Sequence, residues 1–317
     1  MSKMLILNHE KILDIVSQID LIKIIEEGFS KYSAGKVVVP PVGEMLFSDP
    51  PGEVHIKYGY IQDDNYYVIK IASGFYENSK LGLSSSNGLM LLFDQQNGLL
   101  KSILLDEGHL TNLRTAAAGA VVARYLAPKE IKQIGIFGAG VQGKLQLAYL
   151  KDITSCRNVM VWGINQKELN AYKAEMSQLG FKVRITQDSQ TITKSCNFIV
   201  CATPSTTPLI QANQVLPGTH ISAVGSDTPE KQELDAEILK KADLIVADSI
   251  SQCQSRGEIF HALKNDYIEL NEVIELGQII NREKQGRTSD DQISIADLTG
   301  VAVQDIQIAK AVYEACT

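Results

Sequence analysis

The sequence has little that suits an exported, membrane-bound or nucleic-acid-binding protein. Its 317 residues include 5 cysteines without a CxxC pair, and Lys+Arg 30 against Asp+Glu 37 gives a net charge of -7 without a basic block. Residues 1–11 lack the basic-then-apolar pattern of a signal peptide, and the most apolar later stretch, 115–126, is too short to span a bilayer. We therefore expect a cytoplasmic protein with reduced thiols and neither nucleic acid nor a membrane as partner.

Metal-binding patterns are missing as well. The 5 histidines are scattered along the chain, and neither HExxH nor a paired Cys/His cluster occurs. A zinc site needs such nitrogen and sulfur ligands at short, regular spacing. The sequence predicts no metal site.

The length of the chain and its changes in hydrophobic period predict two domains, because 317 residues exceed what one ordinary core fills. The first region opens with a helix on which Ile22, Ile25, Phe29 and Tyr32 share one face and which Gly35 can end. Short, β-rich apolar segments follow and indicate a mixed or antiparallel sheet. They span 53–60, 66–72 and 89–94.

The second region alternates strands with helices, which predicts a parallel, doubly wound sheet of the Rossmann type. A helix over 113–126 precedes it, with Thr111 as the expected N-cap and Pro128 as a stop. The first helices between the expected strands span 141–150 and 166–179. The expected strands span 133–137, 158–162, 182–185, 197–202, 220–224 and 244–247.

The end of the chain should return to the first domain. Residues 300–315 carry apolar side chains at near-helical spacing, and the alternating unit is complete without them. We therefore expect an α/β protein with a Rossmann dinucleotide-binding domain of residues 116–297. The second, α+β domain consists of residues 1–115 and 298–317 and is closed by the C-terminal helix.

A glycine motif points to the cofactor. The strand over 133–137 runs directly into a GxGxxG turn that opens a helix, which is the context such a motif requires. Gly138 allows the tight turn, Gly140 lets the backbone approach a pyrophosphate, and Gly143 lets helix and strand pack closely. Free N–H groups at the helix start attract the anion. The predicted cofactor contacts in this turn are Gly138, Ala139, Gly140, Val141, Gln142 and Gly143.

The end of the second strand leaves the choice between NAD and NADP open. Residues 159–165 contain neither an acid for a ribose 2′-hydroxyl nor an arginine for a 2′-phosphate. Asn165 could hydrogen-bond either ribose, and Lys167 could contact a phosphate. An ordinary solvated helix start explains both residues equally well.

Several segments together resemble the ornithine cyclodeaminase/mu-crystallin family. The resemblance implies hydride exchange with a nicotinamide at a carbon that bears nitrogen and carboxylate, and a homodimer whose first domain supplies the substrate contacts and the subunit interface. The segments run in order along nearly the whole chain. They are Val68-Ile69-Lys70 with Ser73-Gly74, Leu110-Thr111-Asn112-Leu113-Arg114-Thr115-Ala116-Ala117, the glycine turn, Ala223-Val224-Gly225-Ser226-Asp227 with Lys231-Gln232-Glu233-Leu234, and Thr299-Gly300-Val301-Ala302-Val303-Gln304-Asp305.

The resemblance makes Lys70 and Arg114 contacts of the substrate carboxylate. An arginine offers a planar fork to a carboxylate, and a desolvated lysine can also lose a proton in the reaction. Arg114 would lie in the first turn of the helix after Thr111, where a cation is unfavourable without a nearby anion. The competing interpretations are an internal salt bridge for Arg114 and a solvated strand lysine for Lys70.

The resemblance makes Asp227 the second catalytic residue beside Lys70. Asp227 follows an apolar strand, so it should lie at the carboxyl edge of the sheet, where it can hold the substrate amine and exchange its proton. A loop aspartate that caps a turn is the alternative, and Lys231 is expected to brace this loop. Further cofactor contacts expected from the resemblance are Thr115, Thr203 and Ser205, with Pro204, Thr299 and Gly300 as weaker candidates.

Two departures from the family pattern bear on the substrate. Residues 38–44 lack the arginine that many relatives carry after a Val-Pro or Pro-Pro, so Lys57 is a candidate replacement as a substrate contact. His55 is a further candidate substrate contact, because it stands near the place of a carboxylate that holds a distal ammonium in cyclodeaminases and lies on the same strand face as Lys57. An ordinary hydrogen-bonded strand histidine is the alternative. A histidine offers no permanent negative charge, which favours a cyclic imine or a shorter amino acid over ornithine.

The sequence thus predicts an enzyme, an NAD(P)-dependent oxidoreductase or cyclodeaminase. Lys70 and Arg114 from the front half and Asp227 from the back half should converge beside the nicotinamide. The first expected reaction is reduction of pyrroline- or piperideine-2-carboxylate, or the related cyclodeamination of ornithine. An alanine-type dehydrogenase, a non-catalytic binding protein of mu-crystallin type and an unrelated Rossmann dehydrogenase are the alternatives.

Overall fold

The chain forms two compact units in the computed structural model, which describes residues 4–317 apart from the side chains of Tyr76 and Ser79. The first unit comprises Met1–Arg114 and Val301–Thr317, and the second comprises Thr115–Gly300. Residues 1–3 of the expected first domain lie outside the described residues. The predicted α/β class is confirmed, since one unit holds a parallel sheet and the other a second sheet.

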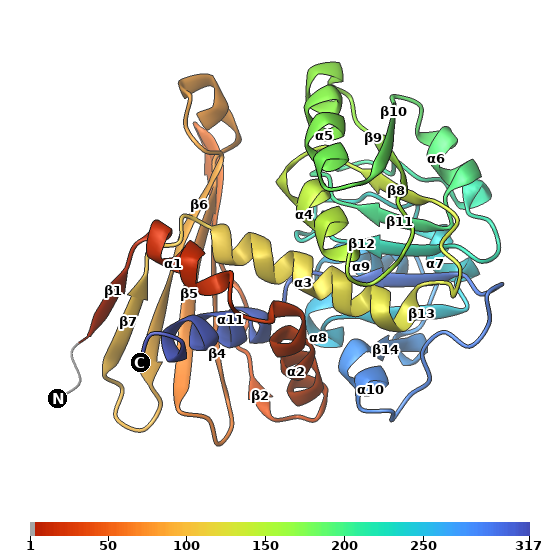
Figure 1. Ribbon diagram of the computed structural model, residues 1–317. Coiled ribbons are helices and arrows are strands. Elements are labelled where there is room, and N and C mark those ends of the chain that lie inside the picture. Colours follow the sequence, from red (N-terminus) through yellow and green to blue (C-terminus); the bar gives the residue numbers. More distant parts are fainter. Residues whose placement is uncertain (1–3) are drawn as a thin grey trace. The chain divides into compact units, whose positions relative to one another are not determined.

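The sheet of the first unit has seven strands in the order β1-β7-β6-β5-β4-β2, with β3 paired to β4 (Figure 1). β1 is parallel to β7 and the other pairs are antiparallel, so the sheet is mixed, as expected. The central strands β4 and β5 are long enough to carry several polar side chains on one face. The strands are β1 Leu5–Leu7, β2 Val37–Val38, β3 Gly43–Ser48, β4 Pro51–Ile61, β5 Tyr66–Gly74, β6 Ser86–Asp94 and β7 Leu100–Leu104.

The helices of this unit are α1 His9–Val16, α2 Leu21–Ser33, the 3-10 turn η1 Tyr76–Leu81 and α11 Val303–Glu314. α2 carries the predicted apolar face, and Gly35 follows its end with φ 70. The last helix, α11, packs against α2, as expected of the C-terminal helix. Gln307 Nε2 donates to the carbonyl of Ile24 at 2.8 Å, and Lys310 pairs with Asp64 at 2.7 Å.

Helix α3 begins earlier than the sequence predicted. It spans His109–Leu126, so Thr111 lies inside it and is not its N-cap. Asp106 supplies the cap instead, because its Oδ2 accepts the N–H of Leu110 at 2.8 Å. Arg114 therefore lies beyond the first turn, so the prediction that placed it there, where the helix dipole disfavours a cation, was wrong.

The second unit holds an all-parallel sheet of eight strands in the order β10-β9-β8-β11-β12-β15-β13-β14. Six strands match the predicted segments, but β14 and β15 were missed. β15 lies between β12 and β13 in the sheet. Its first residue, Ser294, is polar and breaks the apolar pattern, although it is buried and hydrogen-bonds His220 at 2.8 Å. The strands are β8 Ile134–Phe137, β9 Asn158–Trp162, β10 Lys182–Thr186, β11 Phe198–Cys201, β12 His220–Ala223, β13 Leu244–Ala247, β14 Val273–Glu275 and β15 Ser294–Asp297.

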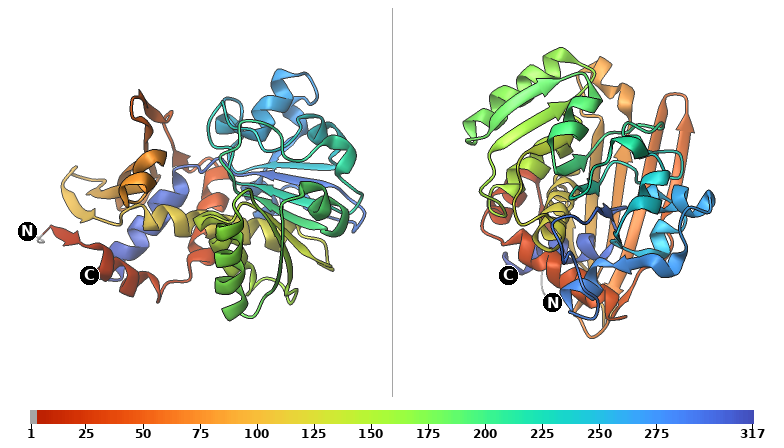
Figure 2. Two further views of the ribbon diagram at one scale, coloured as in Figure 1. Left: turned by 90° about the horizontal axis from the view of Figure 1, so that it is seen from above. Right: turned by 90° about the vertical axis from the view of Figure 1, so that its right-hand side faces the viewer.

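Helices lie on both faces of this parallel sheet (Figure 2). β9 and β10 follow β8 on one side, whereas β11 lies on its other side, so the strand order reverses at β8. Doubly wound sheets bind ligands at the carboxyl ends of strands beside such a reversal. The helical elements are α4 Val141–Leu150, α5 Gln166–Gln178, α6 Ser189–Ser195, η2 Ala212–Gln214, α7 Glu237–Lys241, α8 Ile250–Cys253, α9 Gly257–Lys264, η3 Leu270–Glu272 and α10 Leu276–Ile280.

Two searches of the described residues bear on the kind of site. In residues 4–317, no helix is long and apolar enough to cross a membrane. Over the same residues, no group of three or more His, Cys, Asp or Glu side chains is placed to hold a metal ion. The five cysteines are free thiols.

Candidate functional site

The glycine turn between β8 and α4 has the geometry that a dinucleotide needs. Gly138 has φ 104, and a Cβ there would lie 2.6 Å from the carbonyl oxygen of Ala202. A Cβ on Gly143 would lie 2.0 Å from the carbonyl oxygen of Gly138, so this glycine permits close contact of helix and strand. A Cβ on Gly140 would meet no protein atom within 4 Å. The backbone at Gly140 therefore borders open space, which a pyrophosphate needs in order to come close to it.

A cavity of about 460 Å³ opens beside this turn at the carboxyl edge of the sheet. Its lining includes five of the predicted cofactor contacts and the weaker candidate Pro204, and it adds several residues that the sequence did not single out. Thr115, Val141, Gln142, Gly143 and Asn165 are not among the residues that line it. The lining residues are Gly138, Ala139, Gly140, Trp162, Gly163, Ile164, Glu168, Ala202, Thr203, Pro204, Ser205 and Leu209.

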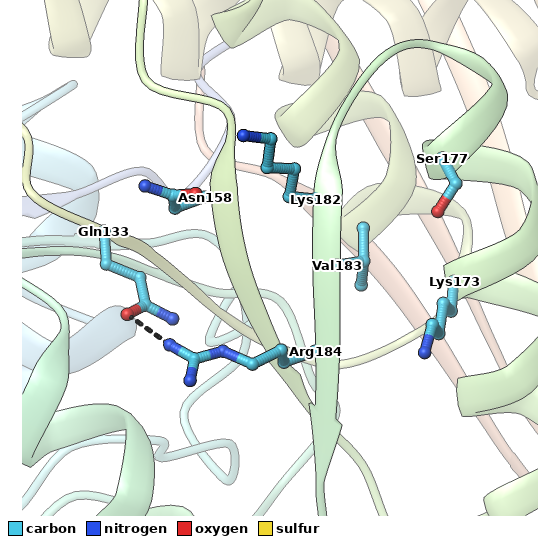
Figure 3. A pocket seen from close by; sticks show the side chains of 7 residues that line it. All are labelled: Gln133, Asn158, Lys173, Ser177, Lys182, Val183 and Arg184. Carbon is cyan, nitrogen blue, oxygen red and sulfur yellow. Dashed lines mark hydrogen bonds between the residues drawn. The ribbon is translucent and has the colours of Figure 1, made fainter.

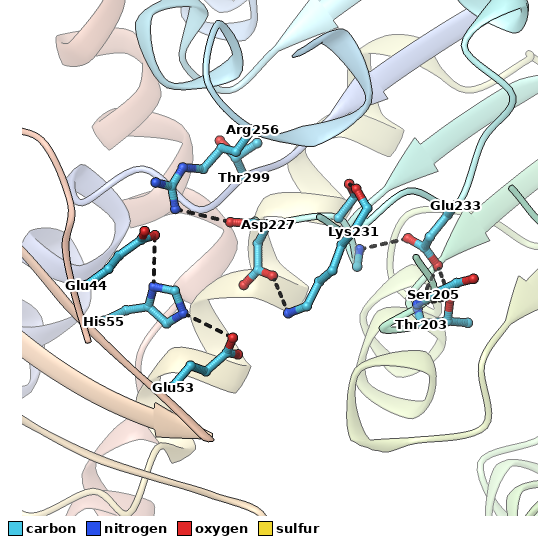
Figure 4. Close-up of polar contacts among 12 residues, drawn as sticks. Glu44, Glu53, His55, Thr203, Ser205, Asp227, Lys231, Glu233, Arg256 and Thr299 are labelled. Atoms are coloured by element: carbon cyan, nitrogen blue, oxygen red, sulfur yellow. Dashed lines mark hydrogen bonds and ion pairs between the residues drawn. The ribbon is translucent and has the colours of Figure 1, made fainter. Parts of the chain in front are cut away.

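A buried glutamate fixes the cavity wall after β11. Glu233 accepts the backbone N–H and the hydroxyl of Thr203 at 2.6 and 2.7 Å, and it accepts the N–H of Gly225 at 3.0 Å (Figure 4). Burial raises the pKa of Glu233 to about 7, although these hydrogen bonds oppose the shift. Glu233 therefore ties the loop after β11 to the loop after β12, and the Thr203 hydroxyl is already engaged.

Asp227 lies in the loop after β12, as expected, with its side chain 40% exposed. Lys231 Nζ donates to Asp227 Oδ1 at 2.7 Å, and Arg256 Nη1 donates to the Asp227 carbonyl at 3.2 Å (Figure 4). Ser226 donates its hydroxyl to the carbonyl of Lys231 at 2.6 Å. These bonds hold the carboxylate in one orientation on a braced loop.

Thr299 and Gly300 are buried and bind another acid in the second unit. The Thr299 hydroxyl donates to Asp248 Oδ1 at 2.9 Å, and the N–H of Gly300 donates to Asp248 Oδ2 at 2.7 Å. Neither residue lines the cavity. Their contacts support a role in packing the segment after β15.

The substrate contacts predicted in the first unit meet at an acid that the sequence reasoning passed over. Lys70 Nζ lies 3.2 Å from Asp305 Oδ2, and Arg114 Nε donates to Asp305 Oδ1 at 3.1 Å. Arg114 Nη1 donates to Gln304 Oε1 at 2.9 Å. The internal salt bridge that competed with a ligand role for Arg114 therefore exists, and Lys70 is buried instead of solvated.

Burial and the neighbouring charges shift the pKa values in this cluster. Burial lowers the pKa of Lys70 to about 8, although Asp305 acts against the shift. Burial alone would raise the pKa of Asp305, but Lys70, Arg114 and Lys57 more than offset it, so this pKa lies below 3.8. Asp305 is thus an anion that three cations share.

Three cations, Lys57, Lys70 and Arg114, gather around Asp305 in the first unit. Lys57 and Lys70 are cross-strand partners on β4 and β5, and both are buried. Asp106, the next acid that acts on Lys70, is buried, and burial raises its pKa. Lys57, Lys70 and Arg114 thus surround the buried carboxylate of Asp305, and Asp106 also acts on Lys70. A group of buried cations of this kind can offer charge-assisted hydrogen bonds to a further carboxylate.

His55 lies between two carboxylates of the first unit. Its Nδ1 is 3.4 Å from Glu44 Oε1, and its Nε2 is 3.6 Å from Glu53 Oε2 (Figure 4). β-strand alternation puts Glu53, His55 and Lys57 on one face of β4. The histidine itself offers no permanent negative charge, but its two neighbours Glu44 and Glu53 are acids that the sequence reasoning did not consider.

A larger cavity of about 580 Å³ lies at the amino ends of β9 and β10 (Figure 3). The three cations that line it do not point toward one place. Arg184 donates a hydrogen bond to Gln133 Oε1 at 3.0 Å, whereas the side chains of Lys173 and Lys182 point in other directions. The glycine turn is at the opposite ends of these strands, where parallel sheets bind ligands. The smaller cavity is therefore the candidate site for the dinucleotide.

Three acids of these sites escaped the sequence reasoning. Asp305 and Glu233 stand inside segments that carry the family resemblance, yet neither was given a role. Asp305 had a usable signal, because it is an acid among the apolar residues of the C-terminal helix. Glu168 is three residues after the helix cap Asn165, and only the folded cavity reveals that it lines the site.

A GxGxxG turn at the reversal point of a parallel sheet, with a cavity at its carboxyl edge, defines a Rossmann-type dinucleotide-binding protein. More narrowly, the chain belongs to the ornithine cyclodeaminase/mu-crystallin family, whose model matches residues 1–317. The resemblance seen in the sequence is thereby confirmed.

Three relatives illustrate the match. An uncharacterized cyclodeaminase of Sinorhizobium fredii is 37% identical, with 99% of this chain and 96% of that protein covered. An archaeal alanine dehydrogenase dimer with bound NAD is 33% identical, with a TM-score of 0.91 over 99% of this chain and 96% of that one. The Δ1-pyrroline-2-carboxylate reductase of Thermococcus litoralis, in complex with NADH and L-proline, is 29% identical, with a TM-score of 0.92 over 99% and 97%.

The expected enzyme class, an NAD(P)-dependent oxidoreductase or cyclodeaminase, is confirmed at the level of the family. The nicotinamide dinucleotide cofactor is confirmed in the same way, because these structural relatives hold NAD or NADH. The reaction of this chain and the roles of its site residues are proposals.

Proposed function

We propose that this protein reduces the C=N bond of an α-imino acid with a nicotinamide dinucleotide. Cyclic imines such as pyrroline- or piperideine-2-carboxylate are the substrates that we favour. The observation that carries the proposal is the buried cluster of Lys57, Lys70 and Arg114 around Asp305. The glycine turn and its cavity support the choice of cofactor. Relatives named for imine reduction and amino-acid dehydrogenation support the reaction class.

The cation cluster would bind the substrate carboxylate. An incoming carboxylate can accept charge-assisted hydrogen bonds from the lysines and the guanidinium. Asp305 holds Lys70 and Arg114 in place for this task. Lys57 would take the part of the arginine that many relatives carry, and its position beside Lys70 supports that role.

Asp227 would handle the proton on the substrate nitrogen. Reduction of an imine adds a hydride to carbon and a proton to nitrogen, and the bound nicotinamide supplies the hydride. Asp227 Oδ1 accepts a bond from Lys231, while its partly exposed carboxylate can still contact a substrate nitrogen. The convergence of Asp227 with Lys70 and Arg114 around one substrate stays a prediction.

A coupled screen tests the proposal. Cyclic imines, ornithine, lysine, alanine, and pyruvate with ammonia are offered with each dinucleotide, and dihydronicotinamide absorbance, ammonia and proline are followed. Consumption of the reduced cofactor with cyclic imines supports the proposal. Turnover confined to alanine or pyruvate would indicate an alanine-type dehydrogenase. Stoichiometric binding without hydride exchange across the panel would indicate a non-catalytic binding protein.

A cyclodeaminase of ornithine-like substrates is a second candidate, favoured by the two glutamates beside His55. A diamino acid carries a distal ammonium, and Glu44 with Glu53 offers it negative charge on the strand face that also carries Lys57. Such an enzyme oxidises the α-carbon, loses ammonia on ring closure and returns the same hydride. Ammonia and proline formed from ornithine without net cofactor turnover would identify this reaction.

The charge of Lys70 should make carboxylate binding depend on pH. Because the pKa of Lys70 is about 8, its ammonium is present below that pH and lost above it. Burial is the main cause of this low pKa, Arg114 lowers it further, and Asp305 and Asp106 oppose the shift. A charge-assisted bond contributes on the order of 1.5–3 kcal/mol, so affinity should fall roughly tenfold to a hundredfold between pH 7 and 10.

Calorimetric titration with pyrrole-2-carboxylate measures this dependence, because the ring nitrogen of that ligand does not titrate in the range. The Lys70→Gln variant should bind weakly at pH 7 and show no further loss up to pH 10. The control is Lys11→Gln, which changes an exposed lysine of the same unit. This variant should bind the ligand with the same affinity and pH dependence as the native protein. A steep pH dependence retained in Lys70→Gln would remove Lys70 from the carboxylate site.

We also propose a homodimer formed through the first unit. Its exposed apolar side chains include Met45, Leu46 and Phe47 on β3 and Leu81 and Leu83 in and after η1. η1 packs against β4, the partner strand of β3, so these side chains gather near one end of the sheet. Exposed apolar surface of this kind is typical of subunit interfaces.

Light scattering after size exclusion tests the dimer. The native protein should have twice the mass of one chain, and the double variant Leu46→Glu, Leu81→Glu should be monomeric, because buried charges without partners oppose association. Leu216→Glu alters an exposed leucine of the second unit and should stay dimeric. A dimer that survives the double substitution would place the interface elsewhere.

A cytoplasmic location is part of the same proposal. All five cysteines are free thiols, and three of them, Cys196, Cys201 and Cys253, are buried. Free thiols are stable in a reducing compartment. Cell fractionation of a tagged full-length chain tests the location.

A further inference from the structure

The first acid after the second strand of the Rossmann sheet lies in the cofactor cavity. β9 ends at Trp162, Asn165 caps α5, and Glu168 follows in the first turn of that helix. Glu168 lines the cavity together with Trp162, Gly163 and Ile164. The end of the second strand is where doubly wound folds contact the ribose that carries either a 2′-hydroxyl or a 2′-phosphate. This part of the cavity therefore decides between NAD and NADP.

The cavity lining near the end of β9 is negatively charged. Among the twelve described residues that line the cavity, Glu168 is the only one with an acidic or basic side chain. Ile164, which stands between the strand and the helix cap, is 83% exposed and offers no charge. A 2′-phosphate is normally bound by an arginine or another cation, and here it would meet a carboxylate instead.

The start of α5 does not replace the missing cation. Helix N-termini bind phosphates through free N–H groups. Asn165 Oδ1 already accepts the N–H groups of Lys167 and Glu168 at 2.9 and 3.3 Å. Lys167, which the sequence left as a candidate phosphate contact, does not line the cavity. Neither free N–H groups at the start of α5 nor a lysine at this position is therefore available in the described lining to bind a 2′-phosphate.

We propose that Glu168 makes this protein selective for NAD(H) over NADP(H). Its carboxylate can accept a hydrogen bond from a ribose 2′-hydroxyl and repels a 2′-phosphate. Asn165 Nδ2 lies 3.4 Å from Glu168 Oε1 and orients the carboxylate. The inference rests on the proposed dinucleotide-dependent function and adds the identity of the cofactor to it.

The single tryptophan of the chain makes the test independent of turnover. Trp162 lines the same cavity, so a bound dihydronicotinamide dinucleotide should quench its emission. Titrations with NADH and NADPH give the two dissociation constants for the native protein, Glu168→Gln and Glu168→Lys. Glu175→Gln is the matched control, because Glu175 is on the same helix and pairs with Lys144 outside the cavity lining.

The native protein should bind NADH at least about tenfold more tightly than NADPH. Added salt should reduce this ratio of dissociation constants, because it screens the repulsion between the Glu168 carboxylate and the 2′-phosphate. Glu168→Gln should narrow the ratio by a factor on the order of ten and remove its salt dependence. Glu168→Lys should bind NADPH more tightly than NADH, whereas Glu175→Gln should keep the native ratio.

Three outcomes would overturn the inference. If the native protein binds NADPH as tightly as NADH, the selectivity does not exist. If Glu175→Gln changes the ratio as much as Glu168→Gln, the effect comes from net charge and not from this site. Both of these outcomes leave the proposed function intact. If neither dinucleotide binds, the inference and the proposed function fail together.

Discussion

Replacing Asp227 with asparagine should lower kcat for imine reduction by about 10² to 10⁴-fold, the usual contribution of a general acid or base. The amide keeps the size of the side chain but cannot supply or remove the proton that the substrate nitrogen exchanges. Cofactor binding, followed through Trp162, should stay near the native value, because Asp227 does not line the cofactor cavity. Steady-state rates with pyrroline-2-carboxylate measure the effect.

Two further variants separate this role from a structural one. Asp152→Asn changes an exposed acid of the same unit and should leave kcat unaltered. Asp227→Glu keeps a carboxylate and should recover part of the lost rate. If Asp227→Asn turned over as fast as the native protein, Asp227 would be only a loop residue held by Lys231 and Arg256.

Replacing Asp305 with asparagine should destabilise the first unit by about 3–5 kcal/mol, the range for removing one partner from a buried ion pair. Lys70, Arg114 and Lys57 would then lose the carboxylate that they share. Part of the cost should be relieved by proton loss from Lys70, whose pKa would fall further without Asp305. Hydrogen exchange of the β5 and α11 amides reports this opening free energy locally.

Acid titration adds a second signature of Asp305. Its pKa lies below the ordinary 3.8 in the folded chain, so the ionised form stabilises the fold at higher pH. That contribution is complete above about pH 3.8 and is lost as the pH falls through the lower, folded value. The Asp305→Asn variant should lack this acid-dependent loss. Asp14→Asn, which alters a surface pair with Lys11, should match the native protein in both measurements.

Local patterns were enough to predict the parallel sheet. Buried strands such as β9 and β13 are short apolar runs, and the turn at Gly138 needs a positive φ that glycine adopts readily. β15 escaped because its Ser294 and Asp297 are polar although both are buried. The start of α3 was misplaced because its cap, Asp106, lies before the segment that looked helical.

Long-range pairing was beyond the sequence reasoning. Arg114 and Asp305 form an ion pair although 191 positions separate them, and the periodicity of each segment carries no information about the other. Glu233 binds Thr203, 30 positions away, for the same reason. His55 drew attention as a missing acid, yet its cross-strand partner Glu44 supplies one from β3.

The amino-acid order by itself determined that this chain would build a Rossmann sheet with a GxGxxG turn, because helix and strand periods and glycine geometry are properties of neighbouring residues. Tertiary structure decided the charge of each binding region. Three cations share Asp305 only because β4, β5, α3 and α11 bring them together, and Glu168 borders the cofactor cavity only because α5 starts at its wall. Electrostatic energy depends on distance and burial, and both are set when the chain folds.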